Sequence, residues 1–344
     1  MKTKAAVLYK LNEPLIIEEI EVPELKRGQV LVKVLYSGIC GSQRNEILGY
    51  KGTDKYLPHL MGHEASGIVE MTGHGVKRIK KNDYVVLTWI KTTGLDAPSS
   101  TYDKNGTAIN AGAITTLGTH MIVSENRVVK ISKKIPPKVA SLLGCAIPTG
   151  SGTVCNTLKI KPRSSVAIFG IGGIGGGAVL ASHYIKKCKI IIAIDINNEK
   201  LKFAKKLGAT HTINATNNDP LESIKKILPH GVDYAIEAAG SKEAMESAFS
   251  CLKDNGMLAI AGNVKDGVKI SLTPFELIKG KKIVGTWGGD SNSEKDIPRY
   301  AHLFLKGVFP IQKLITHEYP FIKLNEAFNT LNKGHAGRII VKIS

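Results

Sequence analysis

The sequence predicts an α/β protein in which a β-rich domain is combined with a doubly wound parallel sheet. Residues 1 to about 90 contain short alternating or apolar segments separated by glycine and proline, a pattern typical of antiparallel β-structure. From Ser164 onward, apolar runs alternate with longer helix-like stretches. Alternating strands and helices enforce parallel pairing through right-handed crossovers, so we expect a sheet covered by helices on both faces.

The first part of the chain contains four strand patterns, followed by a long stretch without periodicity. Strands are expected at 5–9, 29–34, 65–69 and 84–87, where apolar residues alternate or run together between turn residues. The segment 91–118 is rich in threonine, glycine, serine and asparagine. We expect it to be a long surface excursion rather than a regular element.

The second part of the chain reads as a regular series of strands and helices. Buried strands are expected at 165–170 and 189–195, on either side of a helix at 175–188. The later elements are a helix at 198–207, a strand near 211–213, a helix that begins at 218–220, a strand at 232–236, a helix at 242–252 and a strand at 257–261. This order is typical of a nucleotide-binding sheet.

Length and composition agree with a two-domain globular protein. The chain has 344 residues and a mass of 37.1 kDa, which is about twice the usual domain size. Hydrophobic residues make up 43% and charged residues 22%, which argues against disorder and against a disulfide scaffold. Because no apolar run approaches the length of a membrane helix and no signal peptide is recognisable, we expect a cytoplasmic protein without a membrane partner.

The formal net charge of +18 raises the question of a nucleic-acid partner. Only 7 of the 47 basic residues are arginines, and the lysines are spread along the chain. Specific phosphate or base recognition usually depends on arginine forks or on a clustered patch. We therefore expect solvated lysines and no specific nucleic-acid partner.

A glycine-rich turn follows the first buried strand of the second part. Gly170 permits a tight turn, Gly172 lets a pyrophosphate approach bare backbone, and Gly175 lets the next helix pack closely on the sheet. Asp195 ends the following strand, where a carboxylate binds the ribose hydroxyls of NAD and repels the extra phosphate of NADP. NAD is therefore the expected cofactor, and Lys200 either reaches the adenosine ribose or is solvated. The alternative is that the glycines only permit a turn and that Asp195 caps the next helix.

Two cysteines and a histidine of the first part are candidate metal ligands. Taken singly, Cys40 and Cys145 are more simply small buried hydrophobes, and His63 is a loop histidine. Together they supply two thiolates and an imidazole, with Glu64 or water for the fourth position, which is the open tetrahedral set of a catalytic zinc. The other cysteines lack a histidine or carboxylate at metal spacing and are assigned to packing: Cys155, Cys188 and Cys251.

The order of these motifs resembles the zinc-dependent medium-chain alcohol dehydrogenases nearly end to end. The resemblance is carried by Cys40-Gly-Ser, Gly-His63-Glu64, Gly-Cys145-x-x-x-Thr149-Gly, the three glycines and Asp195. Later segments such as Thr286-Trp287-Gly288-Gly289 also fit. The residue pattern of 144–156 most resembles the alcohol and glutathione-dependent formaldehyde dehydrogenase branch.

This resemblance implies a domain organisation and an assembly. Residues 1–146 and 286–344 would form a GroES-like catalytic domain, and residues 147–285 a Rossmann NAD-binding domain, with the active cleft between them. The resemblance also implies a homodimer or homotetramer joined through the edge of the Rossmann sheet near 282–285.

The resemblance also assigns a role to each marker residue. Cys40, His63 and Cys145 would hold zinc, with Glu64 adjacent and able to swing in. Ser42 would pass the substrate's proton outward, Thr149 would touch the nicotinamide, Trp89 would line the substrate pocket and Arg338 would reach the cofactor pyrophosphate. The implied reaction is hydride transfer between an alcohol or polyol and NAD, with an aldehyde or ketone as the product.

Several positions depart from the family pattern. Gln43 stands where an aspartate usually orients the histidine ligand, and Asn45 stands where some members carry a histidine that ends the proton relay. The segment 91–118 contains no cysteine, so we expect one catalytic zinc per chain and no structural zinc. Lys91 in the same segment either meets an anionic substrate or is a plain surface lysine.

Other functions stay open at this stage. A sugar, cyclitol or sugar-phosphate dehydrogenase is the alternative enzyme, favoured by the cysteine-free segment, the missing relay histidine and the basic surface. A zinc-free reductase of the same superfamily would not need the three ligands. A basic nucleic-acid-associated protein on a dehydrogenase scaffold is the alternative from another class, because fold alone does not decide function.

Overall fold

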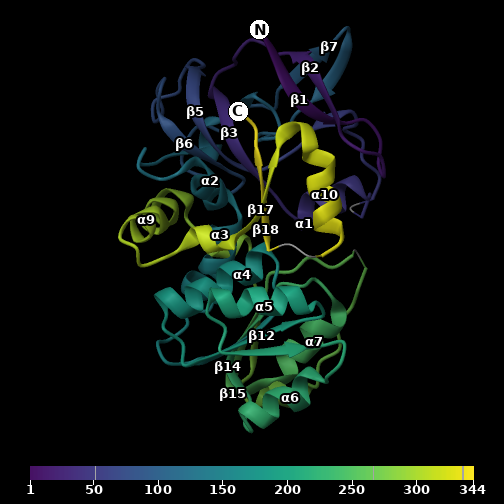
Figure 1. The fold of residues 1–344 in the computed structure, drawn as a ribbon, viewed down its shortest axis with the longest axis vertical. Helices are drawn as coiled ribbons and strands as arrows, with labels where there is room; N and C mark the ends of the chain where they lie inside the picture. Colours follow the sequence, from purple (N-terminus) through teal and green to yellow (C-terminus); the bar gives the residue numbers. More distant parts are fainter. Residues whose placement is uncertain (51, 266, 335–336) are drawn as a thin grey trace.

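The computed structural model describes residues 1–50, 52–265, 267–334 and 337–344. It has two lobes stacked along its long axis, and both chain termini lie in the β-rich lobe (Figure 1). The predicted fold class is confirmed, because one lobe contains a barrel with a second β-sheet and the other a six-stranded parallel sheet. Within these described ranges, no helix is both long enough and apolar enough to cross a membrane.

The β-rich lobe consists of a closed barrel and a larger sheet. The barrel has the order β1-β2-β7-β8-β4, and the sheet has the order β10-β6-β5-β3-β18-β17, with β9 paired to β3. The strands are β1 (Lys2–Leu8), β2 (Ile16–Glu21), β3 (Gln29–Ile39), β4 (His59–Leu60), β5 (Glu64–Thr72), β6 (Tyr84–Thr88), β7 (Thr101–Lys104), β8 (Thr107–Asn110), β9 (His120–Ser124), β10 (Val128–Lys130), β17 (Ile315–Pro320) and β18 (Arg338–Lys342). The four strands expected before residue 90 are confirmed as β1, β3, β5 and β6.

The expectation of an element-free excursion at 91–118 is wrong in the middle of the segment. Residues 101–110 form the β7–β8 hairpin, which closes the barrel between β2 and β4. Asn105 and Gly106 make the two-residue turn with φ of 50° and 86°, as a tight hairpin requires. Tyr102 and Ile109 face each other across the hairpin and are fully buried in the core. The Asn-Gly pair between alternating residues was the signal for this hairpin.

The second lobe is a parallel sheet with the order β13-β12-β11-β14-β15-β16. Its strands are β11 (Ser165–Phe169), β12 (Ile190–Asp195), β13 (His211–Asn214), β14 (Val232–Glu237), β15 (Leu252–Ile260) and β16 (Lys282–Gly285). All six lie within the range predicted for the Rossmann domain, and the strands of the β-rich lobe lie outside it. The exact domain boundaries stay a prediction.

Helices cover both faces of this sheet because side chains of each strand point alternately to the two sides. Val166 and Ile168 of β11 pack in one core with α4 and α5, whereas Ala167 and Phe169 pack in another with α6 and α7. These helices are α4 (Gly173–Leu180, continued by a π-helical turn to Ile185), α5 (Asn198–Leu207), α6 (Pro220–Ile227) and α7 (Lys242–Ser250). The predicted series of strands and helices is therefore confirmed, with small shifts at the ends.

Five further α-helices of the described residues belong to the β-rich lobe or to the junction with it: α1 (Gly41–Ile47), α2 (Pro137–Ala140), α3 (Ala146–Gly152), α9 (Ser293–Leu305) and α10 (Leu324–Asn332). The short α8 (Pro274–Ile278) precedes the edge strand β16 of the parallel sheet. Between the lobes, α3 packs against the turn at Gly288–Asp290. A Cβ atom on Gly289 would lie 2.5 Å from the Thr149 carbonyl oxygen, so only glycine allows this close approach.

Candidate functional site

Three segments that are distant in the chain meet at the junction of the lobes. Cys40 follows β3 and precedes α1, His63 directly precedes β5, and Cys145 directly precedes α3. The Cys40 Sγ atom lies 3.3 Å from Nε2 of His63 and 3.1 Å from Oγ of Ser42. The Cys145 side chain is close enough to interact with the same thiol. The structure therefore places Cys40 in contact with the other two predicted metal ligands.

The surroundings of the two thiols favour one thiolate. The interaction with Cys145 holds the pKa of Cys40 well below its usual value, and the charges of His63 and Arg338 lower it further. The same interaction, together with burial, raises the pKa of Cys145. Two thiols beside an imidazole form a donor set that suits zinc, which binds thiolate sulfur and imidazole nitrogen. The three donor atoms do not all lie within 4.8 Å of one another.

Glu64, which directly follows His63 in the chain, is fully buried. Its Oε2 accepts a hydrogen bond of 3.1 Å from the Ala146 backbone N–H, and its Oε1 forms an ion pair with Arg338. Gly38 and Gly144 leave room for the carboxylate, because a Cβ atom at either position would collide with Glu64. Glu64 thus lies beside the candidate ligands, as predicted.

Arg338 links the candidate metal site to the glycine-rich turn. Ile339 lies opposite Ile39 in the β3–β18 pairing, and this register brings Arg338 next to Cys40. A Cβ atom on Gly173 would lie 3.0 Å from Nη1 of Arg338, so the guanidinium lies against the start of α4. The buried Nε of Arg338 has no hydrogen-bond partner among the described residues. A free buried donor at this place fits an anionic group such as a pyrophosphate.

The glycine turn has the geometry that a dinucleotide requires. Gly170 has a φ of 86°, and a Cβ atom there would lie 2.5 Å from the backbone nitrogen of Ala239. A Cβ atom on Gly175 would collide with the carbonyl oxygen of Gly170. In contrast, a Cβ atom on Gly172 would meet no protein atom within 4 Å. Two of the glycines therefore serve packing, and Gly172 leaves open space at the start of α4, where a phosphate is favoured.

Asp195 ends β12 beside this turn and is buried. Its Oδ2 accepts a hydrogen bond of 2.7 Å from the Ile171 N–H, and its Oδ1 accepts one of 3.0 Å from the Asn197 N–H. The Lys200 ammonium lies 3.9 Å from Oδ2. The cap of α5 is Asn197, whose side chain accepts from the first turn of the helix, so the alternative role of Asp195 as the helix cap is wrong.

Both departures from the family pattern lie on α1. The Oε1 atom of Gln43 accepts a hydrogen bond of 2.8 Å from the Cys40 N–H, so this amide holds the backbone of a candidate ligand. The buried Nε2 of Gln43 has no hydrogen-bond partner in the part of the chain that the structure describes. The Oδ1 atom of Asn45 accepts from Nε and Nη2 of Arg44, at 3.2 and 3.0 Å.

Aromatic side chains border the candidate site on the side of α3. Trp89 directly follows Thr88, whose hydroxyl donates a hydrogen bond of 2.8 Å to the Gly144 carbonyl, next to Cys145. Oγ1 of Thr149 is buried and has no hydrogen-bond partner among the described residues. The Trp89 ring packs edge to face against Trp287, with the ring centroids 5.2 Å apart. Trp287 has no predicted role and was noted only within the Thr-Trp-Gly-Gly segment. Its place beside Trp89 depends on a contact between residues that are distant in the chain.

Hydrogen bonds around a buried carboxylate order the cysteine-free segment. Glu125 accepts from the backbone N–H groups of Lys77, Arg78 and Leu95, at 2.8 to 3.0 Å. Lys91 forms an exposed ion pair with Asp96. The remaining cysteines, Cys155, Cys188 and Cys251, are half-buried or buried among helices and strands of the second lobe.

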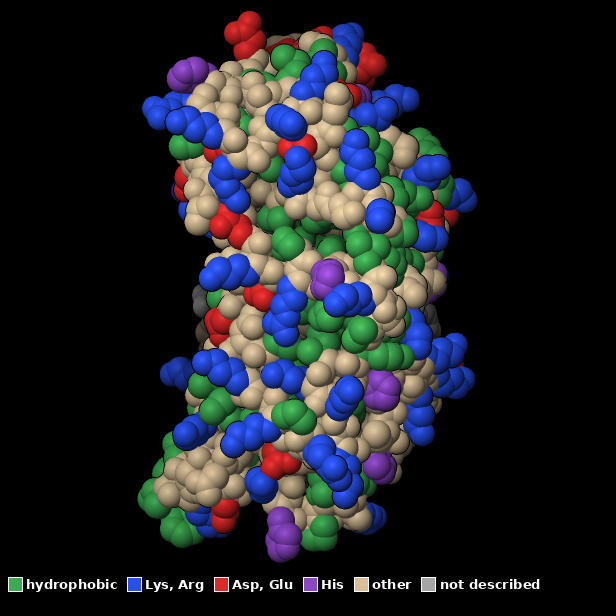
Figure 2. All heavy atoms as spheres, turned by 90° about the vertical axis from the view of Figure 1, so that its left-hand side faces the viewer, with side chains coloured by type: hydrophobic (Ala, Val, Ile, Leu, Met, Phe, Trp, Pro, Cys, Tyr) green, Lys and Arg blue, Asp and Glu red, His purple; other side chains and the backbone are tan. Residues whose placement is uncertain are grey.

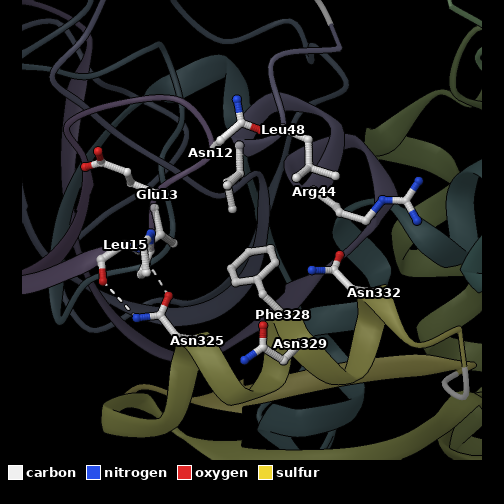
Figure 3. Close-up of a pocket in the computed structure, with 11 residues that line it drawn as sticks. Asn12, Glu13, Leu15, Arg44, Leu48, Asn325, Phe328, Asn329 and Asn332 are labelled. Carbon is white, nitrogen blue, oxygen red and sulfur yellow. Dashed lines mark hydrogen bonds between the residues drawn. The ribbon is translucent and has the colours of Figure 1, made fainter.

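Two other features lie close to the candidate site but contain none of the predicted site residues. A pocket of about 200 Å³ lies between α1 and α10, with Phe328 at its centre and Arg44 at one end (Figure 3). A second group brings donor atoms of Glu46, Asp54 and His59 within 4.8 Å of one another. Its histidine is bonded to Asp54 at 2.9 Å and to the Leu60 carbonyl at 3.0 Å.

Comparisons with known proteins identify the family of the chain. Residues 26–133 match the alcohol dehydrogenase GroES-like domain family, and residues 173–306 match the zinc-binding dehydrogenase family. An alcohol dehydrogenase zinc-binding domain protein from Burkholderia ambifaria is 30% identical with a TM-score of 0.93, over 100% of this chain and 99% of that chain.

Two functionally named structures are also similar. The benzyl alcohol dehydrogenase from Acinetobacter calcoaceticus is 30% identical with a TM-score of 0.90, and the match covers 100% of both chains. The 2R,3R-butanediol dehydrogenase from Bacillus subtilis is 25% identical with a TM-score of 0.80, over 99% of this chain and 100% of that chain. The predicted family is thereby confirmed: the chain belongs to the zinc-binding medium-chain alcohol dehydrogenases and is a zinc-dependent alcohol dehydrogenase-like oxidoreductase.

Proposed function

We propose that the protein transfers hydride between an alcohol or polyol and NAD, with one catalytic zinc per chain. The observation that carries the proposal is the contact of the Cys40 thiol with both His63 and Cys145. The Glu64–Arg338 ion pair connects this donor set to the glycine turn. A metal-bound substrate and a nicotinamide would therefore share one site.

The chain's own residues supply binding, orientation and a proton acceptor. When bound, zinc supplies Lewis-acid chemistry and NAD accepts the hydride. Ser42, whose Oγ lies 3.1 Å from the Cys40 sulfur, would pass the proton of the substrate hydroxyl outward. Thr149 keeps the nicotinamide beside the substrate, and Arg338 holds the pyrophosphate. The Asn45 amide, which stands where some members carry the histidine that ends the relay, does not carry the proton further.

The choice of NAD rests on Asp195. Its carboxylate lies at the end of β12, beside the open space over Gly172, where the adenosine ribose of a bound dinucleotide would lie. A negative charge there repels the additional phosphate of NADP. Lys200, close to the same carboxylate, would touch the ribose from the other side.

For the substrate, we propose an alcohol or polyol, which agrees with the similarity to enzymes named for benzyl alcohol and butanediol. The glutathione-dependent formaldehyde dehydrogenase branch stays a prediction. A sugar or cyclitol remains the alternative substrate. A phosphorylated substrate is less favoured, because Asp96 already pairs with Lys91, the one lysine that we singled out for an anion.

We propose small molecules rather than nucleic acid as partners, in the cytoplasm. Lysine and arginine side chains on the face in Figure 2 are spread over both lobes, between apolar and acidic side chains. This face therefore shows no clustered basic patch of the kind that a nucleic-acid site requires. We further propose a homodimer or homotetramer formed through β16, which is the edge strand of the parallel sheet.

The proposal is tested by metal analysis and turnover of the wild type and one variant. We expect about one zinc per chain, and NADH formation with some member of a panel of alcohols, polyols, sugar phosphates and S-hydroxymethyl thiols. Cys40→Ala should release zinc and abolish turnover but keep NADH binding, measured by cofactor fluorescence. Cys155→Ala, a half-buried cysteine in the other lobe, is the control and should keep both. Full activity of Cys40→Ala without zinc would refute the proposal.

A further inference from the structure

We propose that Trp287 forms the outer wall of the substrate entrance and selects alcohols that carry a flat aromatic ring. The inference rests on the proposed dehydrogenase function and deepens it by naming a substrate class. Trp287 is 79% exposed, which is unusual for the largest apolar side chain. An exposed ring that packs on a second aromatic ring offers a ligand an extended apolar surface.

A continuous line of contacts leads from the candidate metal ligands to Trp287. The Thr88 hydroxyl donates a hydrogen bond of 2.8 Å to the Gly144 carbonyl. Trp89 and Cys145 directly follow these two residues, and the Trp89 ring meets the Trp287 ring at an interplanar angle of 88°. The two centroids are 5.2 Å apart, within the range in which aromatic rings attract each other edge to face. A substrate that approaches Cys145 along the Trp89 ring therefore also passes the Trp287 ring.

The backbone holds Trp287 in its exposed position. The next three residues, Gly288, Gly289 and Asp290, have φ values of 64°, 71° and 46°. The Asp290 carboxylate accepts a hydrogen bond of 2.7 Å from the Thr157 hydroxyl, which fastens the turn to the chain that follows α3. The turn therefore fixes the backbone next to Trp287, and the contact with Trp89 orients the indole.

The chemistry around the two rings favours an apolar ligand. A Cβ atom on Gly288 would lie 3.0 Å from Cδ1 of Ile90 and 3.3 Å from the Trp89 ring. The nearby hydroxyls already donate to backbone carbonyls, Ser291 to Pro148 at 2.8 Å and Ser293 to Ile90 at 3.3 Å. A polyol would need free polar partners at this wall, whereas an aromatic ring needs only ring faces and edges.

The first test compares two alcohols of equal carbon skeleton, flat benzyl alcohol and puckered cyclohexylmethanol. We expect Trp287→Ala to lower the ratio of their kcat/KM values about 3- to 10-fold, mainly through the KM of benzyl alcohol. Trp287→Phe, which keeps a ring, should retain most of the preference. Ile322→Ala removes an equally exposed apolar side chain from the turn that precedes α10. This control variant should leave the ratio of the two kcat/KM values unchanged.

The second test measures binding without turnover. The chain has only two tryptophans, so indole fluorescence reports on this wall. Benzamide, which cannot be oxidised, should quench the fluorescence saturably and bind about 3- to 10-fold more weakly to Trp287→Ala. Cyclohexanecarboxamide is the non-aromatic control and should bind both proteins equally.

The outcomes separate the inference from the proposed function. If the wild type oxidises none of the alcohols, the proposed function fails, and loss of benzamide affinity in Trp287→Ala still supports an aromatic wall. If alcohols are oxidised but the alanine variant changes neither the ratio nor benzamide binding, the inference is overturned. A larger loss with polyols than with benzyl alcohol would overturn the aromatic preference as well.

Discussion

Asp195 combines a structural role with a proposed role in cofactor binding. Its two oxygens hold the glycine turn and the start of the next helix through the backbone N–H groups of Ile171 and Asn197. The same carboxylate is the group that we propose for the cofactor ribose. Its position after the strand was predictable, because the motif is local. The bond to Ile171 was not predictable, because it joins neighbouring strands of the folded sheet.

We expect Asp195→Gly to lower the preference for NAD over NADP about 10- to 100-fold, which is the worth of a hydrogen bond to a charged group. Loss of the negative charge also frees Lys200 for the extra phosphate of NADP. The measurement is the ratio of kcat/KM values for the two cofactors. Asp219→Gly removes a carboxylate that also accepts two backbone N–H groups, but at the start of α6, and should keep the ratio. An unchanged ratio in Asp195→Gly would speak against a ribose contact.

At the scale of elements, the segment 91–97 shows how hydrogen bonds order a stretch without regular structure. Glu125 accepts three backbone N–H groups from two neighbouring loops, and the Ser124 hydroxyl accepts the N–H of Ala97 at 2.8 Å. Burial raises the pKa of Glu125, but the N–H groups of Arg78, Leu95 and Lys77 outweigh it and hold the pKa below its usual value. The carboxylate is therefore ionised in the folded protein at neutral pH.

This depressed pKa has a consequence for stability. The ionised carboxylate stabilises the fold above the ordinary glutamate pKa of about 4.3, and this contribution is lost as the pH falls through the lower, folded-state value. Glu125→Gln should lower the free energy of unfolding by about 1–3 kcal/mol at pH 7, and the difference from wild type should shrink below about pH 4. Thermal unfolding from pH 3 to 8 measures this. Exposed Glu24→Gln is the control, and a pH-independent difference for Glu125→Gln would contradict the assignment.

At the scale of the whole molecule, the parallel sheet ends in an open edge. The strand β16 pairs only with β15 in the described sheet, and the neighbouring α8 exposes Phe275, Leu277 and Ile278. Edge strands with exposed apolar neighbours are usually covered, because they otherwise pair with other chains. A second copy that pairs edge to edge would continue the sheet and cover these side chains.

Sedimentation should therefore give a mass of at least twice 37.1 kDa. Ile278→Glu places a charge in the proposed interface and should raise the dissociation constant at least about tenfold, because burying an unpaired charge costs several kcal/mol. Ile322→Glu changes a side chain of equal exposure, 79% against 78%, on the other lobe and should not alter the mass. A monomeric wild type, or equal effects of both variants, would reject the interface at β16.

The sequence by itself determined the fold class, the order of the parallel sheet's elements, the glycine turn and the candidate ligands Cys40, His63 and Cys145. These features depend on local periodicity and on motifs a few residues long. The tertiary structure decided what pairs across the chain: Arg338 with Glu64, Trp89 with Trp287, and the hairpin at 101–110 within the barrel. These residues are far apart in the sequence, and local periodicity does not predict contacts over such distances. They meet only because the strands and helices pack together.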